Sequence, residues 1–298
     1  MTWFILALLS PAIYVIVNYI DKYVIERKVK DYRGMPIYGA LTGIVIGTLF
    51  WIFSGQPVLS LRDASLVVTS GVISLFAYYL YFSALSKSQT SIVIILFQMT
   101  PIFTLILASI FLKELITVKQ LFGFLLVILA AVALSMEGKL KEVKISSAFY
   151  LILLADVLLA VSALFIKFTI NANSFSKIFS YESWGLALGG LILYIFSSGA
   201  RTAFRVSFRS VGRNVLGIMF LNESIFVVSK AIQFLAIALG PVALVSVLGS
   251  TQVFYGILYG AVLTLLFPHI FKEDVSKKGL LKKLLPSLVL LLGVYLIS

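Results

Sequence analysis

Apolar residues run in long blocks along this chain, and short polar steps separate the blocks. The stretch from Ser91 to Ser135 shows the pattern most clearly. Its first apolar block, Ile92 to Leu112, has about 20 residues, which as an α-helix cross roughly 30 Å of hydrocarbon. A polar step follows, and the second block runs from Leu121 to Leu134. We interpret the stretch as two membrane helices joined by a tight turn.

The same pattern extends over the whole chain and predicts an all-α integral membrane protein. The loops are brief, and even the longest, Asp21 to Pro36, has no room for an inserted soluble domain. The segment from Phe204 to Arg213 mixes aromatic and basic residues, which fits a short interfacial helix or, more commonly, a solvated linker. We expect ten transmembrane helices, at about residues 3–20, 37–54, 66–85, 92–112, 121–135, 148–168, 180–197, 215–239, 243–267 and 284–298.

Composition agrees with a membrane protein and excludes several other classes. Of the 298 residues, 61% are hydrophobic and 12% are charged, and the mean hydropathy is +1.09. The net charge of +12 would suggest a nucleic-acid partner in a soluble protein. Here the basic residues lie between apolar blocks, as the positive-inside rule requires, so we expect no nucleic acid. The chain has no cysteine and its single histidine, His269, lies in a loop, so we expect no metal site and no cofactor.

The two halves of the chain resemble one another. Leu6 to Ile25 aligns with Leu151 to Ile170 at an offset of 145 residues, and four further matches follow in the same order. We therefore divide the chain into two five-helix repeats, residues 1–136 and residues 147–298. Because five is an odd number, the second repeat must enter the membrane in the opposite sense. This predicts the inverted repeat of many secondary transporters.

Basic residues set the expected orientation. Of the 24 Lys and Arg residues, 18 lie in odd-numbered loops and 5 lie in even-numbered loops. The positive-inside rule then places the odd-numbered loops in the cytoplasm and both termini outside the cell membrane. The loop between the first two spans is strongly basic, whereas its counterpart between the sixth and seventh spans is not. The bias therefore swaps between the halves, as inversion requires.

Short motifs recur at corresponding places in the two halves. They are Phe82-Ser83-Ala84-Leu85, Gln98-Met99-Thr100-Pro101-Ile102-Phe103, Leu112-Lys113-Glu114 and Gly123, and then Gly240-Pro241-Val242-Ala243, Gln252-Val253-Phe254 and Gly293-Val294. Together they resemble the drug/metabolite transporter superfamily, in its ten-helix form built from two EamA domains. That resemblance implies a carrier for a small metabolite, an amino acid or a drug-like compound.

The chain also departs from the family pattern. Lys113 stands where the family usually has glycine, and Gln252 occupies the proline position in the second half. An insertion around His269 moves the acidic end of the second motif to Glu273. The family is usually described with cytoplasmic termini, whereas the distribution of basic residues here predicts the reverse.

Three ionisable residues fall inside the expected spans: Asp156 in the sixth, and Glu223 and Lys230 in the eighth. A charge at mid-membrane costs about 2.5–3.5 kcal/mol on insertion scales, so each one needs a reason to be there. Glu223 and Lys230 share a helical stripe, with Gln233 beside it, but lie roughly 10 Å apart along the axis. Either can pair with Asp156, or both can face a wet cavity. In the functional interpretation Lys230 binds an anionic part of the substrate and an acid carries protons; the structural alternative is a buried ion pair or a snorkelling lysine.

Neutral side chains inside the spans form a second group of candidates. Each polar one can line a central path, although an interhelical hydrogen bond is the commoner role. Three tyrosines can form an aromatic wall or simply pack. We expect Pro101 to open a kink beside the path and Glu114 to cap a helix or face solvent. The polar positions are Asn18, Gln98, Thr100, Gln233, Ser250 and Gln252, and the tyrosines are Tyr14, Tyr78 and Tyr81.

The sequence therefore predicts a secondary transporter that moves a small solute across the cytoplasmic membrane by alternating access, with proton-coupled export as one form. A channel-like uniporter or facilitator is an alternative. Another is a flippase subunit or a membrane-embedded enzyme acting on lipid-linked substrates, for which only His269 and Glu273 offer a group near the interface. No catalytic constellation or phosphate-binding loop is present in the sequence, so we expect no enzyme. The expected partners are the substrate and the bilayer, and a homodimer is compatible with the sequence.

Overall fold

The computed structural model describes residues 2–27, 31–85, 87, 93, 96–136, 147–266 and 277–298. Helices account for all of the regular structure in these ranges, so the predicted all-α class is confirmed. The first half contains α1 (Thr2–Arg27), the short 3₁₀-helix η1 (Tyr32–Gly34), α2 (Met35–Phe53), α3 (Leu61–Leu85), α5 (Thr100–Leu107), the π-helical turn η2 (Ala108–Leu112) and α6 (Val118–Met136). The second half contains α7 (Ser147–Ile170), α8 (Phe175–Phe196), α9 (Ser198–Ser210), α10 (Arg213–Leu239), α11 (Val242–Gly249), α12 (Gln252–Leu266) and α13 (Lys277–Ile297).

Eight segments in the described part of the chain are long and apolar enough to cross a membrane. One of them, Val242–Leu266, combines α11 and α12. The other two expected spans correspond to shorter apolar helices, Thr100–Leu112 and Lys283–Ile297. The membrane class is therefore confirmed, while the count of ten spans stays a prediction. Large apolar side chains such as Phe53, Leu129 and Phe196 are exposed on the outer faces, as expected where lipid covers the protein.

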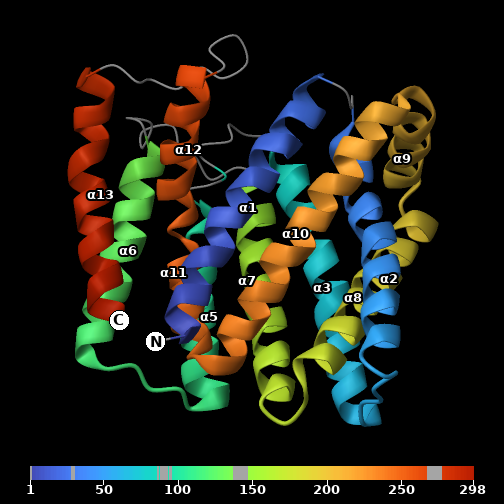
Figure 1. Cartoon of the computed structure of the whole chain (residues 1–298), viewed down its shortest axis with the longest axis horizontal. Helices are drawn as coiled ribbons and strands as arrows, with labels where there is room; N and C mark the ends of the chain where they lie inside the picture. Colours follow the sequence, from blue (N-terminus) through green and yellow to red (C-terminus); the bar gives the residue numbers. More distant parts are fainter. Residues whose placement is uncertain are drawn as a thin grey trace.

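The helices form one bundle in which neighbouring segments run up and down (Figure 1). In that view α1 runs upward from the N-terminus and α7 runs downward, and likewise α3 runs upward and α10 downward. Both chain ends lie toward the lower end of the bundle. Corresponding helices of the two halves thus point in opposite directions, as the inverted repeat predicts; the repeat itself stays a prediction.

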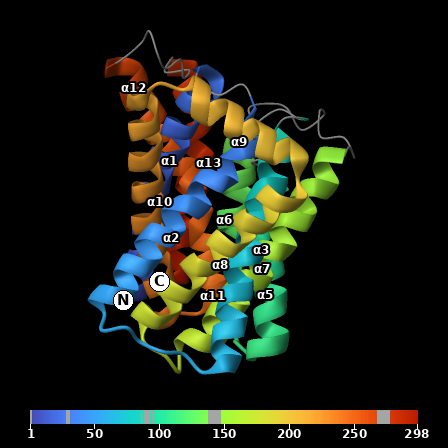
Figure 2. The same cartoon turned by 90° about the vertical axis from the view of Figure 1, so that its right-hand side faces the viewer.

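The main helix pairs join one half of the chain to the other. They include α1 with α10, α3 with α7, α2 with α8, α5 with α11 and α6 with α13, and α3 also packs closely on α8. Exchanging the halves turns the α1–α10 pair into the α7–α3 pair and leaves the α2–α8, α5–α11 and α6–α13 pairs unchanged. The close α3–α8 contact has only a much weaker counterpart between α10 and α2. The turned view shows the same intermixing of helices from both ends of the sequence (Figure 2). The core is therefore shared between the halves.

Hydroxyl bridges support two of these pairs. In α1 and α10, the hydroxyl of Ser10 donates to the Ser229 carbonyl at 3.0 Å, and the Ser229 hydroxyl donates to the Ser10 carbonyl at 2.9 Å. In α3 and α7, the hydroxyl of Ser162 lies 2.7 Å from the hydroxyls of both Ser70 and Ser74. All five serines are buried. Such bonds are a common way for membrane helices to associate, because lipid offers no competing hydrogen-bond partner.

Glycines allow two helix pairs to approach until their backbones touch. A Cβ atom on Gly71 of α3 would lie 2.2 Å from the carbonyl oxygen of Glu182 in α8, and one on Gly185 would lie 2.2 Å from the carbonyl oxygen of Val68. Gly123 of α6 and Gly293 of α13 meet in the same way. A Cβ atom added to Gly123 would lie 2.7 Å from the carbonyl oxygen of Gly293, and one added to Gly293 would lie 2.8 Å from the carbonyl oxygen of Gly123. Small residues at such crossings are typical of packed membrane helices.

The end of the fourth apolar segment explains one departure from the family pattern. After η2, Lys113 takes φ 53° and ψ 29°, the left-handed region. Glycine reaches that conformation freely, whereas another residue pays about 1–2 kcal/mol. The backbone shape that a glycine would supply is therefore kept here with a lysine.

The basic segment after α8 is a helix, so of the two interpretations of this segment the linker is wrong. The hydroxyl of Ser197 accepts from the Ala200 N–H at 3.2 Å and caps α9, which packs on η1 and α8. Ala203 and Ser207 face the bundle, whereas Arg205 and Arg209 are exposed. Figure 1 places α9 at the upper end of the bundle, away from the termini.

Candidate functional site

Four helices from both halves bring charged and aromatic side chains together inside the bundle. The contributions come from α1 and α3 in the first half and from α8 and α10 in the second half. On α10, Glu223, Phe226 and Lys230 follow one another at intervals of three and four residues, which places them on one face of the helix. That face is directed at α1, α2, α3 and α8 rather than at lipid, and its contacts define the site.

Lys230 and Glu182 form a buried ion pair between α10 and α8. The ammonium nitrogen lies 2.5 Å from each carboxylate oxygen, and the two side chains are 7% and 0% exposed. Lys230 Nζ also lies 5.9 Å from the ring centre of Phe226 and 5.5 Å from that of Phe234. The pairing with Asp156 that the sequence suggested for Lys230 is wrong, because Lys230 faces α8. A buried ion pair, the structural interpretation, is present.

Aromatic rings surround this part of α10. The ring of Phe226 lies 5.7 Å from that of Tyr14 in α1 and 5.8 Å from that of Tyr78 in α3. The ring centre of Tyr81, one turn further along α3, lies 5.2 Å from that of Phe97. All three tyrosines that the sequence analysis named are half-buried in this region. The structure brings Tyr14 and Tyr78 together around Phe226, a residue that the sequence analysis did not name.

Two further carboxylates belong to the same region. Asp21 of α1 accepts a hydrogen bond from the Asn222 side-chain nitrogen at 2.7 Å. Glu223 lies against α2, where a Cβ atom on Gly39 would be 3.3 Å from its Oε2. Glu223 interacts electrostatically with both Asp21 and Lys230. The prediction that Glu223 and Lys230 do not pair directly agrees with the geometry: the ion pairs of the described residues do not include Glu223.

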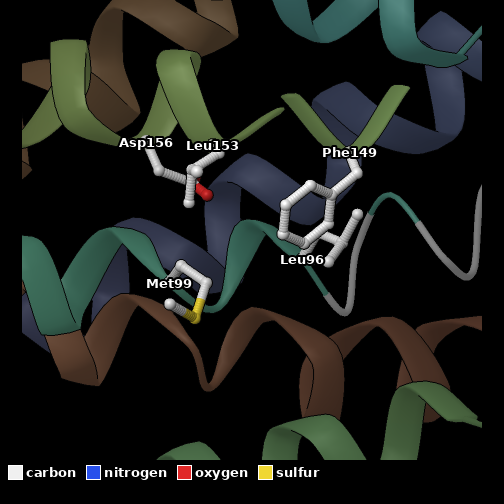
Figure 3. Close-up of a pocket in the computed structure, with 5 residues that line it drawn as sticks. All are labelled: Leu96, Met99, Phe149, Leu153 and Asp156. Carbon is white, nitrogen blue, oxygen red and sulfur yellow. The ribbon is translucent and has the colours of Figure 1, made fainter. Parts of the chain in front are cut away.

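Asp156 belongs to a separate place between α7 and α5. Its Oδ1 accepts from the Thr100 hydroxyl at 2.5 Å, while Oδ2 has no partner among the described residues. It borders a pocket of about 60 Å³. Figure 3 shows Asp156 and Leu153 on one wall, with Met99 opposite and Leu96 and Phe149 at one end. Pockets for drug-sized ligands measure roughly 300–1,000 Å³, so this one suits water rather than such a substrate.

The other predicted residues are dispersed. Gln98 is buried, Asn18 and Gln252 are half-buried, and Gln233 is exposed on the outside of α10. The helical pattern is interrupted directly before Pro101: Gln98 and Met99 form a turn, α5 begins at Thr100, and the proline falls in its first turn. The kink expected at Pro101 stays a prediction. A proline is tolerated there because the first N–H groups of a helix have no intrahelical acceptor.

A second charged pair closes the lower end of the bundle. Lys167 of α7 donates to the carbonyls of Ile237 and Gly240 at 2.8 and 2.7 Å, and so caps the end of α10. Glu114 accepts from the Val242 N–H at 2.9 Å, which caps the start of α11, and lies 3.8 Å from Lys167. Burial raises the pKa of Glu114, and the nearby Lys167 charge only partly offsets it. The capping role expected for Glu114 is confirmed.

The remaining candidates concern catalysis and metals. His269 and Glu273, the pair considered for an enzyme, lie outside the described residues. Within the described ranges, no group of three or more His, Asp or Glu side chains is arranged to hold a metal ion.

Comparison with known proteins finds a family match in the first part of the chain. Residues 1–136 match the model of the EamA-like transporter family. A solved structure described only as "Crystal structure of protein" superposes with a TM-score of 0.69 at 15% sequence identity, covering 100% of this chain and 96% of that one. At that identity the likeness concerns the fold alone. No curated protein matches the sequence. Over residues 1–136, somewhat less than half of its length, the chain is thus similar to the EamA-like transporter family, and its long apolar helices are those of a multi-pass membrane protein.

Proposed function

We propose that this protein is a secondary transporter that moves a small metabolite, amino acid or drug-like solute across the cytoplasmic membrane by alternating access. The observation that carries the proposal is the buried Lys230–Glu182 pair beside Phe226, whose aromatic ring in turn contacts Tyr14 and Tyr78. Charged groups are expensive inside a bilayer and mark substrate or ion pathways there. Helices of both halves contribute to this cluster, so a movement of one half against the other would change it.

The opposite directions of corresponding helices and the exchange of helix pairs between halves support an inverted repeat. Such a repeat has two related conformations, each open to one side. In the proposed cycle the capped turn between α10 and α11, held by Lys167 and Glu114, closes one end while substrate reaches the cluster from the other. A proton gradient, acting through a carboxylate of the cluster or through Asp156, is the proposed energy source for export.

Flux into proteoliposomes, measured with and without a pH gradient, tests the transport proposal. A coupled carrier accumulates solute only when the gradient is imposed, whereas a facilitator equilibrates it in both conditions. If Lys230→Ala and Glu223→Gln both leave the flux and its pH dependence unchanged, the cluster is not the site. A lipid-linked product formed without solute movement would instead favour the enzyme or flippase alternative.

The proposed orientation has a simple test of its own. We propose that the odd-numbered loops are cytoplasmic and that both termini lie outside, from the 18 of 24 basic residues on the odd-numbered side. The chain has no cysteine, so Ser298→Cys introduces a single thiol. Labelling of that thiol by an impermeant reagent in intact cells supports the orientation. Labelling only after the membrane is permeabilised reverses it.

A further inference from the structure

We propose that the cluster binds substrates that carry a positive charge on nitrogen, such as protonated amines. This inference rests on the transport function proposed above and names the substrate class for the same site. In the functional interpretation of the sequence, Lys230 binds an anionic group of the substrate. The arrangement of charges, unpaired acceptors and aromatic rings points to the opposite sign.

Lys230, the one cation among the described side chains of the cluster, is already neutralised. Lys230 directs its ammonium group at both oxygens of Glu182, each at 2.5 Å, and neither side chain is more than 7% exposed. An anionic substrate would have to break this pair and leave Glu182 buried without a counter-charge. Breaking such a pair is strongly unfavourable. Lys230 is therefore a poor anion site while the pair is intact.

Two other carboxylates of the cluster form no ion pair with any side chain that the structure describes. No Lys or Arg nitrogen of those side chains lies within 4.0 Å of Asp21 or Glu223. Asn222 is 3% exposed and gives its side-chain nitrogen to Asp21, and its Oδ1 has no hydrogen-bond partner in the described structure. The amide oxygen has no donor, and the two carboxylates can accept further hydrogen bonds beside the one that Asp21 receives from Asn222. An ammonium group supplies up to three donors and a positive charge, and it has no acceptor.

The total charge of the cluster leads to the same conclusion. Asp21, Glu182 and Glu223 are three carboxylates, and Lys230 is the one ammonium among the described side chains of the cluster. With all four groups ionised, two negative charges would remain uncompensated in an apolar setting, which is unfavourable. A cationic ligand reduces that excess, whereas an anionic ligand adds to it.

Aromatic faces offer the second half of a cation site. The rings of Tyr14 and Tyr78 both contact Phe226, with centres 5.7 and 5.8 Å from it. The ammonium group of Lys230 lies 5.9 Å from the same phenyl ring, within the range of a cation–π contact. Aromatic groups of this kind recognise alkylammonium ligands in many proteins. Rings and carboxylates together therefore favour an amine attached to an apolar body.

Counterflow into proteoliposomes with matched probes tests the inference. The probes are panels of primary amines, carboxylates and alcohols that share the same aryl-alkyl bodies, for example 2-phenylethylamine, 3-phenylpropionate and 2-phenylethanol. We expect amines to be exchanged and their matched carboxylates not, with an apparent affinity at least tenfold higher for the amines. Asp21→Asn and Glu223→Gln should each lower amine affinity at least tenfold. Asp63→Asn, which removes a carboxylate hydrogen-bonded to Asn173 at the other end of α3, should leave it unchanged.

A stability measurement separates a binding role from a structural one. Because each unpaired carboxylate disfavours the empty protein, Asp21→Asn and Glu223→Gln should unfold at the same or a higher temperature while losing amine exchange. Carboxylates or alcohols exchanged in preference to amines would overturn the charge assignment and leave the transporter intact. Variants that keep full amine affinity would overturn it as well. If no probe of any class moves, the proposed transport function fails together with it.

Discussion

Removing Lys230 should destabilise the protein more than removing Lys230 and Glu182 together. In the wild type the two side chains are 7% and 0% exposed, and both carboxylate oxygens contact the ammonium nitrogen. Replacing Lys230 by methionine leaves a carboxylate in a fully buried position, which costs about 3–5 kcal/mol. At roughly 2–4 °C per kcal/mol, this lowers the unfolding temperature by about 6–20 °C. Glu182→Leu leaves the opposite charge and should have a similar effect.

The double variant, Lys230→Met with Glu182→Leu, leaves no unpaired charge. It should unfold within about 1–2 kcal/mol of the wild type, because apolar side chains of similar volume often replace a buried ion pair without loss. Thermal unfolding of the purified protein in nanodiscs provides the measurement, with Lys177→Met on α8 as the control. At low pH the loss of stability in Lys230→Met should become smaller, since a protonated, neutral Glu182 needs no counter-charge. Single variants within about 1 kcal/mol of the wild type, or a double variant as unstable as the sum, would refute the reasoning.

Three further predictions concern packing, hydrogen bonding and pH. Gly293→Val should cost about 1–3 kcal/mol, because even a Cβ there meets the Gly123 carbonyl oxygen at 2.8 Å; Gly217→Ala, with nothing within 4 Å, should be neutral or stabilising, and thermal unfolding compares the two. Ser162→Ala removes the hydroxyl that bridges α3 and α7 and should cost about 0.6–1.7 kcal/mol in a denaturation curve; no measurable loss would mean that the bridge contributes nothing to stability. Because burial raises the pKa of Glu114 above its ordinary 4.5, the folded protein holds a proton that the unfolded chain releases, and stability falls as pH rises through the interval between the two values. Glu114→Gln has no carboxyl group to titrate at this position, so its unfolding temperature relative to the wild type should rise over that pH interval. A difference in unfolding temperature that stays constant with pH would contradict the raised pKa of Glu114.

Much of the fold follows from the length of the apolar blocks. Each block is long enough to span the bilayer or close to it, so the helices appear where the hydropathy pattern places them. The stripe that joins Glu223 to Lys230 also follows from helical spacing alone. Contacts between residues on different helices could not be predicted from hydropathy or helical spacing. Glu182 lies near the start of its expected span and next to Tyr181, which makes it look like an interfacial residue, and only the packing of α8 on α10 reveals it as the partner of Lys230.

Other site residues were missed because their role depends on neighbours from elsewhere in the chain. Phe226 is one phenylalanine among 24, and nothing local distinguishes it; its position between Tyr14 and Tyr78 depends on three helices. Asp21 lies at the end of the first apolar block, where solvation is the ordinary expectation, yet Asn222 holds it against α10. For Asp21 and Glu182 the sequence does carry one usable signal, because each is an ionisable residue within or beside an apolar block.

The close crossing of α3 and α8 has a mechanical consequence. At Gly71 and Gly185 no side chain separates the two backbones, so the helices can turn about this fulcrum but cannot part without opening a void. The pair related to them by exchange of the halves, α10 and α2, packs much more loosely and holds the Glu223 carboxyl beside Gly39. The two contacts therefore do not allow the same amount of movement. When one part of the bundle rotates relative to the other, we expect the helices to move mainly at the α10–α2 contact, while the α3–α8 crossing serves as the axis of rotation.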